Sequence, residues 1–342
     1  MSRSVFLDLA ASGHRVPIGT HLVLHTRPDA DAVLLDGAGL GGVIAETAER
    51  FRTPLAIPLM DLTLEKAAML GAMDAPAAEV DSFHFDQSPA PPGALRITPR
   101  MRAVCDAIAH VASKTSLVPC GIGIGPFSLM TKLVRDPITP VFLAGTGMTG
   151  EDEPEVAEIE GFLAVGIEII LAYFAAQADA GAKAIIVCEP AANIVYFSPN
   201  QLAKSFEIFD RYVMAPMRRI KNLLDARGVD LIFHDCGELT NEMVARFSTL
   251  DPAMMSLGCS RCLWEDASLV PKTTVLYGNL PTKKFYSPQL TVADVESLSR
   301  ELLDNMRAAG HPFILGSECD VLSVPGSEEE VLAKVNAFMT VN

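Results

Sequence analysis

Residues 231–237 read Leu-Ile-Phe-His-Asp-Cys-Gly, an apolar run followed directly by a His-x-Cys pair and a glycine. The three apolar residues predict a short buried strand. Side chains two apart in a strand point to the same face, so the imidazole of His234 and the thiol of Cys236 are expected to project side by side. The same arrangement, an apolar run that ends in polar or reactive residues, recurs along the chain.

Five further apolar runs are found, at residues 54–61, 117–125, 184–189, 274–279 and 313–319. In the same order, they end at Asp61, at Gly123 and Gly125, at Glu189, at Asn279 and at Cys319. Segments with helical periodicity lie between them, among them residues 155–180, 198–226 and 292–309. This alternation predicts a parallel α/β fold. A closed (β/α)8 TIM barrel is favoured over an open sheet, because no dinucleotide fingerprint follows the first strand and the polar residues gather at strand ends. Residues 136–154, rich in glycine, proline and acids, are expected to form a loop.

Composition limits the kind of protein further. With 342 residues and 49% hydrophobic content, the chain is expected to form one barrel domain over residues 1–342. No apolar run approaches the roughly 18 residues that span a membrane, and Asp8 interrupts a start that does not resemble a signal peptide. Seven cysteines, an odd number, indicate reduced thiols and a cytoplasmic location. The formal charge of −15 disfavours binding to nucleic acid.

The His-x-Cys pair is half of a predicted metal site. Imidazole and thiolate are ligands that suit zinc, and Cys319 is the best candidate for a third ligand. Three protein ligands leave one tetrahedral position open, which is typical of a catalytic zinc. Two thiolates and one imidazole would leave the ion less positive, which suits deprotonating a substrate thiol while keeping it nucleophilic. The alternative is a buried core histidine beside an inert cysteine.

The other strand-end residues allow two interpretations each. Asp61 and Glu189 either cap the turns that follow them or line a pocket. The glycines from residue 121 to 125 either make a tight turn or let a large planar ligand approach the backbone. Residues 259–262, Cys-Ser-Arg-Cys, form a CxxC motif that no second CxxC accompanies. Its two cysteines are either ordinary thiols, residues with some role near the metal, or a redox pair.

The chain resembles the uroporphyrinogen decarboxylase superfamily over nearly its whole length. The matching stretches are Pro-Leu-Met-Asp-Leu-Thr-Leu-Glu at 58–65, Gly-Pro-Phe-Ser-Leu at 125–129, His-Asp-Cys-Gly at 234–237, Gly-Asn-Leu at 278–280 and Gly-Ser-Glu-Cys-Asp-Val at 316–321. The resemblance implies a TIM barrel. The tetrapyrrole decarboxylases of this superfamily carry an N-terminal Met-Arg-Gln-Ala-Gly-Arg stretch that binds substrate carboxylates. Residues 14–27 lack it, although Asp61 falls where those enzymes keep a catalytic aspartate.

A second branch, the corrinoid-dependent methyltransferases, uses a His-x-Cys…Cys zinc site, which stands here as His234, Cys236 and Cys319. The chain looks like the methylcobamide:coenzyme M methyltransferases and their bacterial relatives. This resemblance implies methyl transfer between a corrinoid (methylcobalamin) on a partner protein and a zinc-activated small molecule. That molecule would be a thiol or a methylated or methoxylated compound. The partner would dock over the C-terminal face of the barrel.

In this reading, Asp61 and Glu189 serve catalysis from the pocket wall, while Gly123, Gly125 and Asn279 shape its mouth and contact the cofactor. Two alternatives remain, a decarboxylase of a tetrapyrrole or another acid, and a non-catalytic barrel that binds a corrinoid or tetrapyrrole. The sequence does not determine the methyl donor, the acceptor or the direction of transfer. A homodimer is compatible with it.

Overall fold

The computed structural model describes residues 3–72, 80–85 and 97–341. In these residues eight parallel strands form one sheet in the order β1-β8-β7-β6-β5-β4-β3-β2. The strands are β1 (Arg15–Val16), β2 (Leu55–Ala56), β3 (Val118–Ile124), β4 (Ala184–Cys188), β5 (Asp230–Asp235), β6 (Met254–Leu257), β7 (Val275–Leu280) and β8 (Phe313–Ser317). The order follows the chain around a nearly closed ring, which confirms the predicted TIM barrel.

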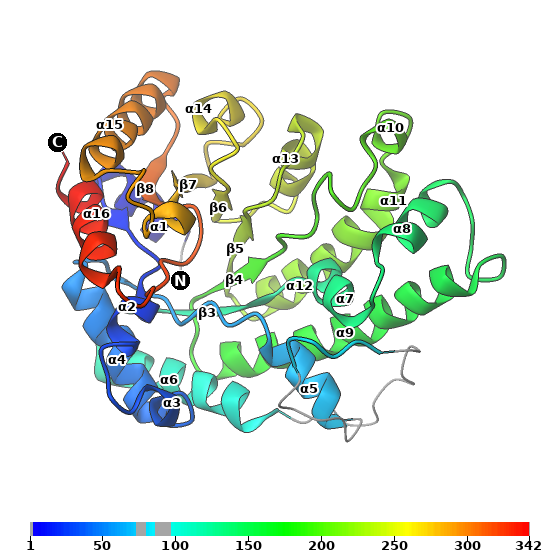
Figure 1. Cartoon of the computed structure of the whole chain (residues 1–342), viewed down its shortest axis with the longest axis horizontal. Coiled ribbons are helices and arrows are strands. Elements are labelled where there is room, and N and C mark those ends of the chain that lie inside the picture. The colour runs from blue at the N-terminus through cyan, green and yellow to red at the C-terminus, as the bar shows by residue number, and fades with distance from the viewer. Residues whose placement is uncertain (1–2, 73–79, 86–96, 342) are drawn as a thin grey trace.

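Helices surround the strands (Figure 1). They are α1 (Ser4–Ala11), α2 (Thr20–Leu24), α3 (Ala30–Val33), α4 (Gly37–Arg50), α5 (Leu64–Ala72), α6 (Pro99–Lys114), α7 (Pro126–Leu133), α8 (Ile138–Gly145), α9 (Pro154–Asp179), α10 (Pro199–Leu202), α11 (Glu207–Phe209), the π-helical turn η2 (Asp210–Met214), α12 (Ala215–Ala226), α13 (Asn241–Ser248), α14 (Leu263–Asp266), the 3-10 turn η3 (Thr282–Lys284), α15 (Val292–Ala309) and α16 (Glu328–Thr340).

Alternation along each strand separates two apolar layers. On β5, Ile232 belongs to the cluster inside the barrel, whereas Leu231 and Phe233 belong to the cluster between the strands and the helices. Because successive side chains of a strand point to opposite faces, His234 shares the inward face of Ile232. The histidine therefore points into the barrel at the C-terminal end of β5.

Two stretches differ from their predicted secondary structure. The predicted loop at residues 136–154 contains the helix α8, whose first backbone N–H groups donate to the side chain of Asp136 at 2.9 and 3.1 Å. The predicted single helix at 198–226 is instead α10, a break, and then α11, η2 and α12. Pro216 stands just after the π-helical turn, and its missing N–H removes one bond of the regular helical ladder there.

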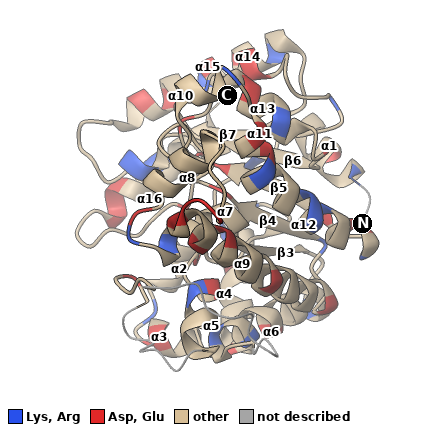
Figure 2. Ribbon diagram, turned by 90° about the vertical axis from the view of Figure 1, so that its right-hand side faces the viewer, with Lys and Arg blue, Asp and Glu red and all other residues tan. Residues whose placement is uncertain are grey.

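No apolar run of membrane-spanning length was expected from the sequence, but α9 is long and apolar enough to cross a membrane by length and composition alone. It packs instead against α7, α8, α12 and β3, and 56% of its most apolar window is buried. Charged residues lie along the outer helices, with acids on α9 and bases on α12 (Figure 2). The helix therefore forms part of the barrel wall.

Candidate metal centre

The structure brings His234, Cys236 and Cys319 together. One ligand atom from each residue lies within 4.8 Å of the others. His234 is part of β5, Cys236 follows that strand directly, and Cys319 follows β8 by two residues. The strands β6 and β7 separate β5 from β8 in the sheet, so the curvature of the barrel brings the two strand ends together.

The imidazole of His234 is 1% exposed, and its two nitrogens have different surroundings. Nδ1 lies 2.9 Å from the hydroxyl oxygen of Ser256 on β6. Nε2 is buried and has no hydrogen-bond partner among the described residues. A metal-binding histidine commonly donates one ring N–H to a neighbour and offers the other nitrogen to the ion. A soft divalent ion such as zinc would satisfy Nε2 and both thiols, so the three residues fit this metal.

The two thiols of the group differ in acidity. The hydrogen bond from Cys319, with His234 and Lys283 nearby, holds the pKa of Cys236 well below its ordinary value. The same hydrogen bond, together with burial, raises the pKa of Cys319. The Cys319 sulfur also lies 3.6 Å from the thioether of Met60. The thiolate form that zinc requires is therefore favoured at Cys236 before any metal binds.

A cavity of about 530 Å³ reaches this group at Cys319. Its wall contains two carboxylates and the charged groups that pair with them. Arg100 donates to Asp61 at 2.7 Å, and His21 lies 3.0 Å from Asp320. A slightly larger hollow of about 570 Å³ lies between α9 and α12, on the outer side of the barrel and away from the strand ends. The cavity at Cys319, unlike the hollow between α9 and α12, opens next to a thiol of the metal group.

Asp61 stands in this cavity wall and also caps the turn that follows it, by accepting a hydrogen bond from the backbone N–H of Thr63 at 3.2 Å. Its carboxylate accepts hydrogen bonds from the hydroxyl of Thr63 at 2.6 Å and from Arg100. Burial acts to raise the pKa of Asp61, but these hydrogen bonds outweigh it and lower the pKa. The side chain is therefore an ionised, firmly held carboxylate at neutral pH.

Glu189 was expected in the pocket wall and lies elsewhere. It is fully buried after β4, and its carboxylate accepts hydrogen bonds from the backbone N–H groups of Phe127 at 2.7 Å and Ser128 at 3.3 Å, at the start of α7. Burial raises the pKa of Glu189 to about 8. The carboxylate therefore caps the first turn of α7, which lies about 60 residues earlier in the chain, and not the turn that follows Glu189.

Gly123 near the end of β3 and Gly125 just after it were expected to leave space for a cofactor, and protein side chains fill that space. A Cβ atom on Gly123 would lie 2.4 Å from the carboxylate of Glu65, and one on Gly125 would lie 1.7 Å from that of Glu189. Asn279, expected at the pocket mouth, is 5% exposed and donates to the carbonyls of Gly258 and Arg261. Side chains and backbone groups of the protein thus occupy the space beside Gly123 and Gly125 and bind the amide of Asn279.

The CxxC thiols do not join the metal group among the described residues. Cys259 contacts the carboxylate of Glu318, and Cys262 contacts that of Glu265. Burial and the carboxylate of Glu318 raise the pKa of Cys259 to about 12. The pKa of Cys262 is raised by burial and by its acidic neighbours. Both thiols are held in the protonated form, which is the opposite of a reactive redox pair.

Sequence reasoning missed Ser256, Met60 and Lys283. Ser256 lies within a buried strand that reads Met-Met-Ser-Leu, and its register opposite His234 is set by strand pairing. Lys283 follows β7 in η3 and lines the cavity together with Met60. The position of Lys283 and Met60 just beyond strand ends was a usable signal, whereas nothing in the sequence marked Ser256.

Comparisons with known proteins agree with this architecture. No curated protein matches the chain. Among solved structures, a methyltransferase from Methanosarcina mazei superposes with a TM-score of 0.69 over 99% of this chain and 98% of that chain, at 15% sequence identity. That likeness shows a shared fold. The model of the uroporphyrinogen decarboxylase family matches residues 45–339. The chain therefore belongs to the uroporphyrinogen decarboxylase family.

Proposed function

We propose that the protein is a zinc-dependent methyltransferase. It would move a methyl group between a corrinoid on a partner protein and a small molecule whose heteroatom zinc activates. The observation that carries this proposal is the group of His234, Cys236 and Cys319, whose ligand atoms lie within 4.8 Å of one another beside a cavity of about 530 Å³. The solved relative of the same fold is itself named a methyltransferase.

The donor set supports this chemistry. One nitrogen and two sulfurs leave a tetrahedral ion one open position, and a zinc ion there supplies Lewis acidity that lowers the pKa of a bound heteroatom. Two thiolates offset the charge of the ion, so the activated atom keeps its nucleophilic character. The cavity meets the group at Cys319, which gives a small molecule a route to the open position.

Residues of this chain would prepare the site. Ser256 would hold the ring of His234 so that Nε2 faces the two sulfurs. Lys283, which contacts Cys236 and lines the cavity, would offset negative charge on the thiolates. Asp61 and Arg100 form an ion pair in the cavity wall that would orient the small molecule.

The corrinoid partner would approach the C-terminal ends of the strands. Three large apolar side chains are exposed in segments that follow β4, β7 and β8: Val195 is 58% exposed, and Tyr286 and Leu322 are each 51% exposed. Such residues are enriched where proteins meet. All seven cysteines are free, which supports action in the reducing cytoplasm.

Arginine content favours methyl transfer over tetrapyrrole decarboxylation. Among the described residues that line the cavity, Arg100 is the single arginine, and it already pairs with Asp61. A substrate with many carboxylates needs several bidentate partners of this kind. The cavity is therefore better suited to a small acceptor or donor.

Metal content tests the proposal most directly. We expect about one zinc per chain in the purified protein, lost in Cys236→Ala and retained in Cys105→Ala, which removes a thiol of α6 outside the group. The zinc-loaded protein should then demethylate methylcobalamin in the presence of a thiol, and the Cys236 variant should not. Absence of zinc from well-folded wild type would overturn the proposal and favour the decarboxylase or the non-catalytic barrel.

A further inference from the structure

The segment Gly258–Cys262, here called the bracket, touches the loops of both cysteine ligands. It begins directly after β6 and contains the CxxC motif, whose thiols have no place in the proposed site. Its neighbours on the two sides are the strand end that carries Cys236 and the segment that carries Cys319. The parts of the motif that contact the two cysteine ligands' surroundings are therefore its backbone and the side chain of Arg261.

On the Cys236 side, the bracket packs directly on backbone. The N–H of Gly258 donates to the carbonyl of Asp235 at 3.1 Å. A Cβ atom on Gly258 would lie 2.8 Å from the carbonyl oxygen of Cys236 and 3.0 Å from its Cα. A side chain at this position would push against the backbone of the ligand itself, so the close approach depends on glycine.

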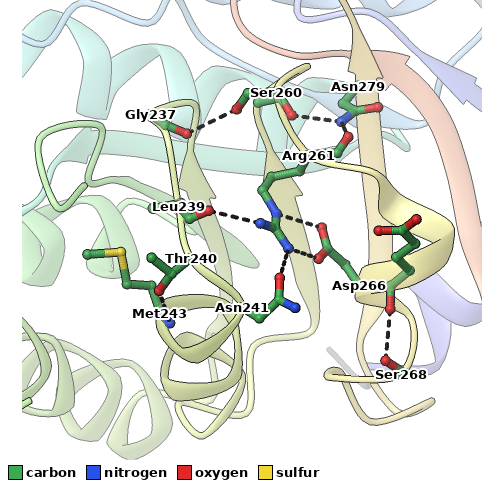
Figure 3. A network of polar contacts seen from close by, with 12 residues as sticks. Gly237, Leu239, Thr240, Asn241, Met243, Ser260, Arg261, Asp266, Ser268 and Asn279 are labelled. Carbon is green, nitrogen blue, oxygen red and sulfur yellow. Dashed lines mark hydrogen bonds and ion pairs between the residues drawn. The ribbon is translucent and has the colours of Figure 1, made fainter. Parts of the chain in front are cut away.

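Arg261 extends this contact to the loop that follows Cys236 (Figure 3). Its guanidinium donates to the carbonyl of Leu239 at 2.8 Å and to the side chain of Asn241 at 2.7 Å. It also forms a two-pronged ion pair with Asp266, a carboxylate that is 0% exposed. The planar guanidinium thus joins the loop after β5 to the first residue of α13 and the last residue of α14.

On the Cys319 side, the bracket is attached to the residue next to the ligand. The N–H of Cys259 donates to the carboxylate of Glu318 at 3.0 Å, and Glu318 is 3% exposed. From β7, the side chain of Asn279 donates to the carbonyls of Gly258 at 2.7 Å and Arg261 at 2.9 Å. The bracket therefore has fixed contacts to the neighbours of both Cys236 and Cys319.

We infer that the bracket sets the separation of Cys236 and Cys319, with Arg261 as a positioning residue for the metal centre. This inference rests on the zinc site of the proposed function. A buried ion pair contributes little net stability compared with apolar packing, so its value lies in fixing one geometry. Residues that orient metal ligands typically change metal affinity 10- to 100-fold when they are replaced.

The test compares Arg261→Lys with Arg246→Lys as a matched control. Arg246 also pairs with both oxygens of a carboxylate, that of Asp210, through its Nη1, but it joins α13 to η2 on the outside of the barrel. For each protein we would measure the zinc dissociation constant by competition with a chromophoric chelator. The absorption spectrum of the Co²⁺-substituted protein reports the geometry of the thiolate ligands, and thermal unfolding of the metal-free protein reports stability.

We expect Arg261→Lys to weaken zinc binding by about tenfold or more and to change the Co²⁺ spectrum. Arg246→Lys should shift only the unfolding temperature. Glu318→Ala, which removes the acceptor of the Cys259 N–H at the other end of the bracket, should weaken zinc binding in the same direction. It replaces Arg261→Lys in the test if that variant does not fold. Wild-type zinc affinity and Co²⁺ spectra in the Arg261 and Glu318 variants would overturn the inference while leaving the zinc site intact. A wild type that binds no zinc would instead overturn the proposed function.

Discussion

Nδ1 of His234 lies 2.9 Å from the hydroxyl oxygen of Ser256, and the two residues face each other on the paired strands β5 and β6. This contact occupies one ring nitrogen and leaves the buried Nε2 without a partner among the described residues. The serine hydroxyl is thus the group that determines which nitrogen faces Cys236 and Cys319.

Ser256→Ala should weaken zinc binding by about tenfold, because the imidazole would lose the partner that fixes its orientation. Chelator competition on the purified variant measures the change. Ser299→Ala is the matched control, since Ser299 is equally buried but donates to a carbonyl within α15. Equal zinc affinity in the Ser256 variant and the wild type would show that the ring is held by packing alone.

Cys319→Ala should remove both zinc and methyl transfer. The variant would leave one imidazole and one thiolate of the three-residue group, too few for a stable zinc site. Elemental analysis and the methylcobalamin assay measure the two losses, with Cys105→Ala in α6 as a control thiol outside the group. Full retention of zinc in the Cys319 variant would exclude this residue as a ligand.

Gly125→Ala should destabilise the protein by about 3 kcal/mol, the upper part of the range for overpacking in a core. The new Cβ atom would lie 1.7 Å from the carboxylate of Glu189 and force it off the amides of α7. Urea unfolding measures the change. Gly42→Ala in α4, where a Cβ atom meets nothing within 4 Å, should be neutral or stabilising. Similar unfolding midpoints for the two variants would show that the carboxylate moves aside freely.

Glu65→Gln should flatten the dependence of stability on pH. Burial raises the pKa of Glu65 from 4.5 to about 8, so between these values the folded protein keeps a proton that the unfolded chain releases. Stability is therefore highest below the unfolded pKa and falls as pH rises through this window, by up to about 1.4 kcal/mol per pH unit.

Urea unfolding at several pH values between about 5 and 8 would measure this slope. Glutamine keeps the shape of the side chain and has no carboxyl proton to lose, so the variant should show a smaller slope. Glu301→Gln on the exposed surface of α15 should leave the slope unchanged. A slope equal to that of the wild type in the Glu65 variant would mean that Glu65 is ionised in the fold.

The barrel was predictable because most of its strands are short apolar runs that alternate with helical segments, whereas β1 has only the two residues Arg15–Val16 and carries no such run. The helices α9 and α15 likewise agree with the periodicity of residues 155–180 and 292–309. The helix α8 was not predictable from composition, because prolines and glycines lie on both sides of an apolar segment that other helices cover. The break between α10 and α11 depends on how the barrel wall packs. The periodicity of a local stretch of sequence carries no information about that packing.

By itself the sequence determined the fold class, the projection of His234 and Cys236 from one face of their strand and the identities of the three candidate ligands, because strand alternation and ligand chemistry are local properties. The tertiary structure alone decided how Glu189, Gly125 and Asn279 are used, since each is occupied by a partner far away in the chain. It also decided the contact of Ser256 with His234 and the place of Arg261 between the ligand loops. Such contacts depend on the register and curvature of the closed sheet, which a single strand does not encode.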